Sequence, residues 1–258
     1  MKFKTSVIFS NRKTKWSIDF GICKFMAKNT EGRYVSKTCP GCYAATLLNV
    51  YSGVRNKLEA NTGKFPNMDD FKRDIKAIKD TGHRFIRFYS LGDFSDVREI
   101  EYIHAAADIM PVELFSKTLH TYFRKYIPKI ASHPKVNISL STNKSWDAKY
   151  IEELASFIVQ NKLAKNVQLN YTFIGDEEVV KKPFISVYHT TKKDKTALKA
   201  VFGRNRICCA RDEQGKEIVT KNSGNHKGSC ARCPLCKLPA ANANGDILVP
   251  KLMQQVSL

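Results

Sequence analysis

The 258-residue sequence lacks any long apolar run. The first apolar stretch, residues 7–9, ends where charged residues resume and is too short for a signal peptide. No later stretch has the length of a membrane span, and low-complexity linkers and internal repeats are missing as well. We therefore expect a protein that has no membrane segment and stays in the cytoplasm in which it is made.

Acidic residues are scarce relative to basic ones. The chain has 24 Asp and Glu against 43 Lys and Arg, a formal net charge of +19, which exceeds what solubility requires. Hydrophobic residues make up 43% of the chain and aromatic residues 10%, enough to bury a sizeable core. The composition excludes a disordered or fibrous chain and indicates a folded protein with a polyanionic partner.

From about residue 84 onward, apolar runs of strand length alternate with amphipathic runs of helix length. The predicted strands are residues 85–91, 112–118, 136–142, 167–173 and 184–189. The predicted helices between them are residues 97–110, 121–132, 148–162 and 195–202. This alternation predicts parallel strands joined by crossover helices.

The first third of the chain predicts a strand at residues 16–22, a long helix at 43–58 and a second helix at 68–81. About six strand–helix units result, which fit an open doubly wound sheet or a partial barrel. We take the fold class as α/β, a partial (β/α)6-type barrel over residues 1–203. A cysteine-rich, metal-stapled segment, residues 204–258, packs on the same domain. In either arrangement, ligands bind at the carboxyl ends of the strands.

Eight cysteines in a chain without an export signal argue against a disulfide framework and favour metal binding. The strongest motif is Cys230-Ala-Arg-Cys233-Pro-Leu-Cys236. Three thiolates spaced i, i+3 and i+6 can wrap one face of a 4Fe-4S cluster, while the backbone amides of the turns point at its sulfides. We therefore predict an iron–sulfur cluster held by this run.

A fourth ligand must come from elsewhere in the chain. Cys208 or Cys209, about twenty residues upstream, is the near candidate, and we give Cys208 the preference. Cys39 and Cys42 form the remote candidate pair. Cys23 has no cysteine at metal-ligand spacing and is interpreted as a buried thiol.

Zinc is the competing metal. It takes four tetrahedral thiolates, usually from two Cys-x2-Cys knuckles, and Cys39-x2-Cys42 with Cys233-x2-Cys236 would supply them. This pairing leaves Cys230 without a role, so the iron–sulfur interpretation uses the motif more fully.

Several motifs occur in a specific order: Thr38-Cys-Pro-Gly-Cys-Tyr-Ala44, Arg87-Phe-Tyr-Ser-Leu-Gly-Asp-Phe94, Leu114-Phe-Ser-Lys-Thr118, Ile138-Ser-Leu-Ser141, and Cys208 followed by Cys230-x2-Cys233-x2-Cys236. With these motifs the chain resembles the bacteriophage "gene product 88"-type proteins over most of residues 35–240. The resemblance implies a phage origin, hence the cytoplasm of a bacterial host, and a cluster-binding α/β fold.

A looser similarity is to radical SAM enzymes, which carry a cluster at the mouth of a partial barrel. Ser90-Leu-Gly92-Asp93, after the second predicted strand, resembles the strand end that holds the methionine part of SAM. This similarity implies a redox or radical-SAM-like enzyme with SAM as a candidate cofactor. Those enzymes carry Cys-x3-Cys-x2-Cys after the first strand, where this chain has Cys39-x2-Cys42.

Polar residues follow the predicted strands, at positions that line the ligand site of a parallel sheet. Asp93 and Lys117 are the first candidates for substrate binding. The others are Thr142, Asn143, Asn170, Tyr171 and His189. The alternative for each is an ordinary cap or turn residue.

The basic excess is concentrated near the C-terminus, where residues 181–258 carry fifteen Lys and Arg against five acidic residues. We predict that this stretch binds DNA or RNA through phosphates, with weak sequence preference. The candidate contacts are Lys192, Lys193, Lys195, Lys199, Arg204, Arg206 and Arg232. One alternative is that part of this charge offsets a tetrathiolate cluster. The predicted function is thus a phage iron–sulfur protein that binds nucleic acid, with a cluster enzyme or a zinc-stapled structural protein as alternatives.

Overall fold

The computed structural model describes residues 2–11, 15–36, 39, 42–143, 148–163, 165–172 and 185–188. The predicted helix at residues 195–202 and the cysteine-rich segment 204–258 lie outside the described residues. Within the described ranges, no helix combines the length and the apolar character that a membrane crossing requires.

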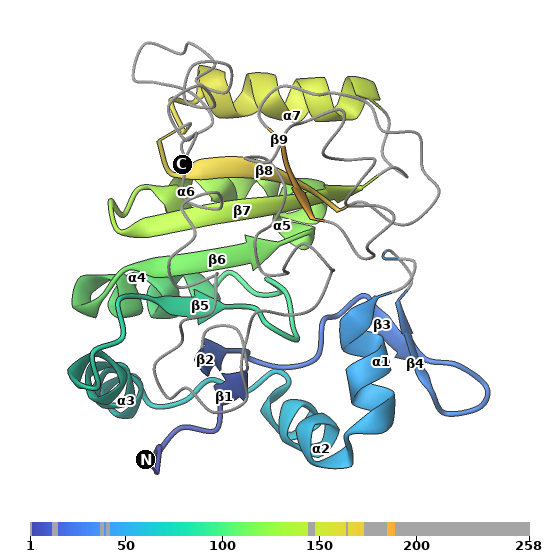
Figure 1. The fold of residues 1–258 in the computed structure, drawn as a ribbon, viewed down its shortest axis with the longest axis vertical. Helices are drawn as coiled ribbons and strands as arrows, with labels where there is room; N and C mark the ends of the chain where they lie inside the picture. The colour runs from blue at the N-terminus through green and yellow to red at the C-terminus, as the bar shows by residue number, and fades with distance from the viewer. Residues whose placement is uncertain are drawn as a thin grey trace, which may run out of the picture.

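A mixed, mostly parallel sheet of seven strands forms the centre of this α/β fold (Figure 1). Its order is β1-β2-β5-β6-β7-β8-β9. The strands are β1 (Ile8–Asn11), β2 (Lys15–Ile18), β5 (Ile86–Phe88), β6 (Val112–Ser116), β7 (Val136–Asn143), β8 (Val167–Thr172) and β9 (Ile185–Tyr188). Only β1 runs antiparallel to its neighbour β2. Among the described residues, β1 and β9 are the two edges, so the sheet does not close into a barrel there.

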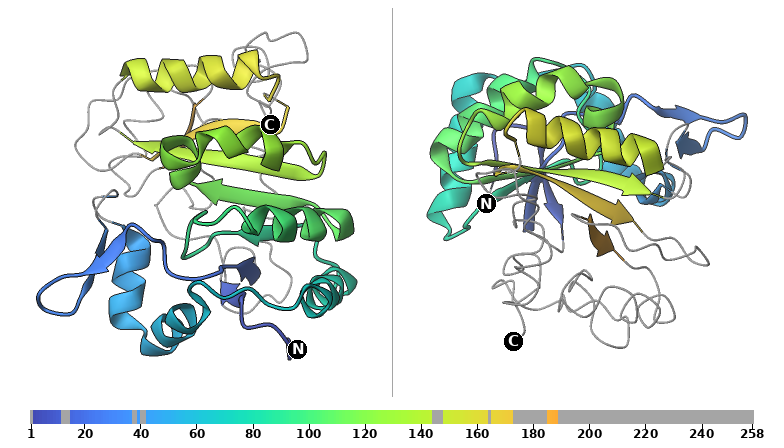
Figure 2. Two further views of the ribbon diagram at one scale, coloured as in Figure 1. Left: turned by 180° about the vertical axis from the view of Figure 1, so that it is seen from behind. Right: turned by 90° about the horizontal axis from the view of Figure 1, so that it is seen from above.

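From β2 to β9, each parallel strand pairs with the next strand of the sheet in chain order. Right-handed crossovers between sequential neighbours put all connecting helices on one face of a sheet. Figure 2 shows this arrangement for the helices α3 (Met68–Asp80), α4 (Glu99–Ile109), α6 (Ile127–Ala131) and α7 (Ala148–Gln160). A doubly wound sheet would reverse its order at a switch point. The described strands contain no such reversal.

The two faces of the sheet differ in chemistry because successive side chains of a strand point to opposite faces. One set is apolar and forms a single core with the helices; it includes Ile86, Phe88, Val112, Leu114, Val136, Ile138, Leu140, Val167 and Leu169. The alternate set is largely polar, and in register it places Ser17 beside Arg87, Arg87 beside Glu113 and Glu113 beside Asn137. Both faces of a doubly wound sheet would be apolar, whereas the described helices cover only one face of this sheet.

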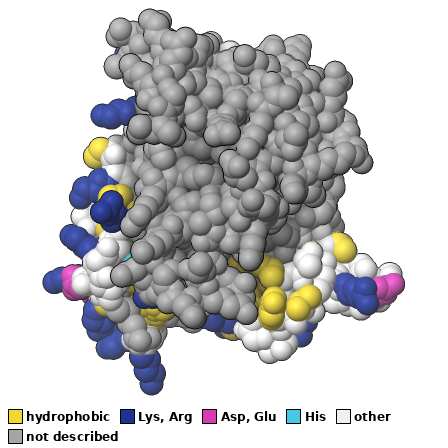
Figure 3. All heavy atoms as spheres, in the orientation of Figure 1, with side chains coloured by type: hydrophobic (Ala, Val, Ile, Leu, Met, Phe, Trp, Pro, Cys, Tyr) yellow, Lys and Arg dark blue, Asp and Glu magenta, His cyan; other side chains and the backbone are white. Residues whose placement is uncertain are grey.

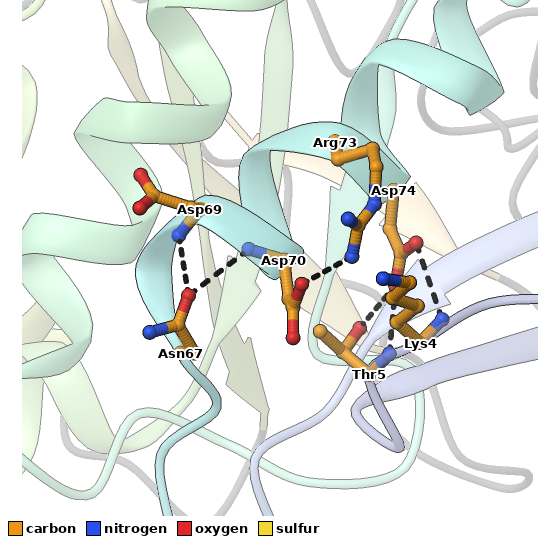
Figure 4. Close-up of polar contacts among 7 residues, drawn as sticks. All are labelled: Lys4, Thr5, Asn67, Asp69, Asp70, Arg73 and Asp74. Carbon is orange, nitrogen blue, oxygen red and sulfur yellow. Dashed lines mark hydrogen bonds and ion pairs between the residues drawn. The ribbon is translucent and has the colours of Figure 1, made fainter.

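Helix α3 begins at a side-chain cap and anchors the N-terminal segment (Figure 4). The Oδ1 atom of Asn67 accepts the backbone N–H groups of Asp69 and Asp70 at 3.0 and 3.2 Å, which satisfies two donors that the first turn leaves open. One turn further along, the carboxylate of Asp74 accepts the N–H and the hydroxyl of Thr5 at 2.8 and 2.9 Å. The chain that leads into β1 is thereby fixed against the helix.

Two long helices of the sequence prediction are interrupted. The predicted helix at 43–58 consists of α1 (Tyr43–Val50) and α2 (Ser52–Asn61), because Tyr51 between them adopts an extended conformation. The predicted helix at 121–132 consists of α5 (Thr118–Tyr122), a 3-10 turn, η1 (Arg124–Tyr126), and α6. Pro128 lies in the first turn of α6, where it prevents a continuous helix because it lacks an N–H group.

The sequence prediction gives two strands with wrong bounds and misses three others. The predicted strand 85–91 ends at Phe88, because Tyr89 adopts a φ of 61° that ends the extended conformation. The predicted strand 16–22 is the shorter β2. The hairpin of β3 (Met26–Lys28) and β4 (Tyr34–Ser36) and the edge strand β1 were not predicted; each is only three or four residues long.

Candidate metal and ligand site at the carboxyl edge of the sheet

Asp19 joins the ends of the first two parallel strands. It directly follows β2, and its side chain is 0% exposed. Its Oδ1 atom accepts three backbone N–H groups of the loop after β5, from Ser90 at 2.9 Å, Leu91 at 2.8 Å and Gly92 at 2.7 Å. Burial raises the pKa of Asp19, while the hydrogen bonds from Gly92 and Leu91 oppose that rise. The carboxylate therefore fixes the loop after β5.

Asp93 repeats this arrangement one strand further along. Its Oδ2 atom accepts the backbone N–H groups of Lys117 and Thr118, at 2.9 and 3.3 Å. Its Oδ1 atom accepts the hydroxyls of Ser116 and, at 2.9 Å, of Thr118. Burial raises the pKa of Asp93 against these hydrogen bonds. Both oxygens thus hold the end of β6, and a substrate at Asp93 would compete with these contacts.

Two glycines allow the loops of this edge to approach each other closely. A Cβ atom on Gly92 would lie 2.7 Å from the carbonyl oxygen of Gly21, and a Cβ atom on Gly21 would lie 2.7 Å from the Cα atom of Thr62. Real Cβ atoms do not approach other atoms so closely, so these loops require residues without side chains. The loop after β5 thus joins strand ends through three kinds of contact: the backbone N–H groups of Ser90, Leu91 and Gly92, the close approach at Gly92, and the carboxylate of Asp93.

Three cysteines come to the same edge. Cys42 is the N-cap residue of α1, and its N–H donates to the carbonyl oxygen of Cys39 at 3.1 Å. The N–H of Cys39 donates to the hydroxyl of Ser36 at 3.0 Å, at the end of β4. Cys23 lies in the loop after β2, and its pKa is raised to about 12 by burial and by the nearby charges of Asp93, Cys39 and Cys42. All three are half-buried.

The donor set at this edge fits part of a metal site. In the described part of the chain, no three His, Cys, Asp or Glu side chains are grouped closely enough to hold a metal ion. Cys39 and Cys42 are spaced i, i+3 around the start of a helix, where backbone N–H groups favour a negatively charged group. They can supply one or two ligands. The remaining predicted ligands lie outside the described residues: Cys208, Cys230, Cys233 and Cys236.

The other predicted ligand-site residues fall into two groups. Lys117 directly follows β6 and is half-buried. At the ends of β7 and β8, register pairs Thr142 with Tyr171, so Thr142, Asn143, Asn170 and Tyr171 reach the same edge of the sheet. His189 and the predicted nucleic-acid contacts lie outside the described residues; these contacts are Lys192, Lys193, Lys195, Lys199, Arg204, Arg206 and Arg232.

Glu99 is a buried carboxyl group that the sequence interpretation missed. It is 1% exposed and accepts the hydroxyl of Tyr89, the hydroxyl of Ser95 at 2.8 Å and the N–H of Asp96 at 2.9 Å. Burial raises its pKa to about 7. The pattern Asp96-x-x-Glu99 before an apolar run is the signature of a capping box. This signal could have identified the start of α4 and the role of Glu99.

His120 is a second buried titratable group beside this edge. Its Nε2 atom lies 3.0 Å from the carbonyl oxygen of Ser141, and its Nδ1 atom lies 3.1 Å from the hydroxyl of Tyr150. Burial is the main cause that lowers the pKa of His120 to about 4, so the imidazole is neutral at physiological pH. The sequence around His120 contains no pattern that predicts its burial or these contacts.

In comparisons with known proteins, no family model, no curated protein and no solved structure matches this chain. The resemblances to phage and radical SAM proteins therefore stay predictions, and the function must be argued from the chain's own residues.

Proposed function

We propose that this protein is an iron–sulfur protein whose 4Fe-4S cluster lies at the carboxyl edge of the sheet. In this proposal Cys230, Cys233 and Cys236 supply three ligands, and the Cys39–Cys42 turn supplies the fourth in place of Cys208, which the sequence analysis preferred. The observation that carries it is the position of that turn: two cysteines at the start of α1, at the edge where the loops after β2 and β5 meet. When bound, the cluster would supply redox chemistry at this edge.

The strand order supports the finer fold assignment within the same proposal. Six parallel strands in sequential order, with the described helices α3, α4, α6 and α7 on one face, are typical of a partial (β/α)6-type barrel. The carboxyl edge would then be the barrel mouth. Ligation by the C-terminal run would tie segment 204–258 to this mouth, so metal binding and the folding of that segment would be coupled.

Nucleic-acid binding is the second part of the proposal, and the charge of the chain favours it. The formal net charge is +19, and fifteen of the basic residues lie in residues 181–258. Lys and Arg side chains of the described residues also follow the left margin of the face in Figure 3, over α3 and α4. Basic residues of this number give phosphate affinity that is independent of sequence and weakens with salt.

An enzyme that uses the cluster is the alternative, and the polar face of the sheet favours it. Polar side chains from β2, β5, β6 and β7 lie in register on the face that the described helices leave uncovered. Asp93 and Lys117 would then stand beside a substrate, and SAM would be the cofactor under the radical-SAM-like form of this alternative.

One preparation separates these proposals. Protein purified without oxygen should be brown and contain iron and sulfide, whereas a zinc-stapled protein would be colourless. A gel-shift titration at about 50 mM salt with duplex DNA, single-stranded DNA and RNA then tests binding. If no complex forms at micromolar protein, the polyanion proposal fails and the enzyme alternative takes its place.

A further inference from the structure

Arg87 is the one cationic side chain that the polar face presents from the middle of the parallel sheet in the described strands. Its strand neighbours in register are Ser17 on β2 and Glu113 on β6. The side chain leans toward the carboxyl edge: its Cζ atom lies 4.3 Å from the centre of the Phe115 ring, two residues beyond Glu113. Its Nη2 atom likewise points to the carbonyl oxygen of Tyr89, beyond the end of β5.

Among the described residues, most of the hydrogen-bonding capacity of Arg87 is unused. Within the described residues its only hydrogen bond is the one from Nη2 to Tyr89, at 3.5 Å, the outer limit for such a bond. Its Nε atom is buried and has no partner. A guanidinium has five N–H donors in a rigid planar fork, and a buried donor without an acceptor is costly. In the described part of the chain, the Nε–Nη2 edge therefore has only the weak contact with Tyr89 and could bind further acceptors.

The neighbouring acids do not occupy this edge. Glu113 is adjacent in register, yet the two side chains form no ion pair in the described part of the chain. Glu113 instead accepts the side-chain amide of Asn137 at 3.3 Å. Asp19 uses its oxygens for backbone N–H groups and for the hydroxyl of Ser17. Its charge interacts with Arg87 only through space.

We propose that Arg87 anchors a binding site for the carboxylate or phosphate group of a small molecule. The Nε–Nη2 edge matches two oxygens of such a group, which it would hold in a bidentate contact. The cation–π contact with Phe115 restrains the guanidinium, so little side-chain freedom is lost on binding. The site lies on the sheet and not in the basic C-terminal third, and it does not depend on the cluster.

Two probes test this site and distinguish the two chemistries. Inorganic phosphate and glutarate are titrated into the full-length protein by calorimetry, at constant ionic strength. The wild type should bind at least one of them saturably, and the probe that binds identifies the group. Arg87→Gln should weaken that binding by about tenfold or more, the loss expected for a charged hydrogen bond. Arg87→Lys should also weaken it, because lysine keeps the charge but loses the fork.

Arg84→Gln is the matched control, since Arg84 is an exposed arginine three residues before Arg87; it should bind the probe as the wild type does. The iron content of each protein is measured in parallel, so loss of the cluster is distinguished from loss of the anion site.

Phenylglyoxal labelling of the wild type needs no variant: the bound probe should slow the modification of Arg87 but not of Arg84. Equal binding by Arg87→Gln and wild type, no saturable binding, or equal labelling with and without probe would overturn the proposal.

Discussion

Replacing His120 by Gln should reduce the loss of stability that the protein undergoes in acid. The imidazole of His120 is 1% exposed, and burial lowers its pKa to about 4 from an ordinary value of 6.5. The folded protein keeps this group neutral, while the unfolded chain takes up a proton below pH 6.5. The unfolded state thus binds more protons between pH 6.5 and 4, so the free energy of unfolding falls as pH falls through this window.

The size of this effect follows from the two pKa values. With one pKa unit equal to about 1.4 kcal/mol, His120 costs about 2 kcal/mol of stability by pH 5 and about 3 kcal/mol by pH 4. Gln does not titrate, although it sacrifices some packing at every pH. Contributions of other groups, including Glu99, cancel in the difference between the two proteins.

Urea unfolding of both proteins, followed by circular dichroism at pH 7.5, 6 and 5, measures this difference. Relative to the wild type, the His120→Gln variant should gain about 2 kcal/mol between pH 7.5 and 5. Parallel stability curves over that range would refute the assignment of His120 as a buried neutral group.

The remaining predictions concern the strand-end loops and the basic segment. Asp19→Ala should lower the free energy of unfolding by about 3 kcal/mol in urea titrations, because three backbone N–H groups lose their acceptor; Asp19→Asn, which keeps an oxygen there, should cost clearly less. Gly92→Ala should lower the melting temperature, because its Cβ would meet the Gly21 oxygen, whereas Gly53→Ala in α2 meets nothing within 4 Å and should be neutral or stabilising; equal effects would contradict the close approach. Nucleic-acid affinity should fall about a thousandfold or more between about 50 and 200 mM salt. Replacing three lysines together by Glu should weaken nucleic-acid binding and leave the iron content unchanged; these are Lys192, Lys193 and Lys195.

The sequence predicts the elements whose periodicity is long and regular. Strand β7 and helices α3 and α7 lie within two residues of their predicted bounds. An apolar periodicity that continues over eight or more residues is compatible with only one type of secondary structure. The breaks at Tyr51 and before α6 were missed, since a continuous apolar pattern hides a local change of backbone angle. Short strands such as β3 give too few residues for a period.

The arrangement at the carboxyl edge could be predicted only in part. The rule that strand ends collect ligand residues correctly selected Asp93 as a residue of this edge. That Asp93 and Asp19 hold neighbouring loops depends on contacts between residues up to 73 positions apart, for which the local sequence carries no signal. Arg87 was overlooked for the same reason: its environment is set by side chains from neighbouring strands.

The iron content and absorbance of protein purified without oxygen test the central claim most directly. The wild type should contain about four irons per chain and be brown. The double variant Cys39→Ser, Cys42→Ser should lose this iron, while Cys23→Ser and Cys208→Ser should keep it. A double variant that retains full iron and colour would contradict a cluster at the carboxyl edge of the sheet.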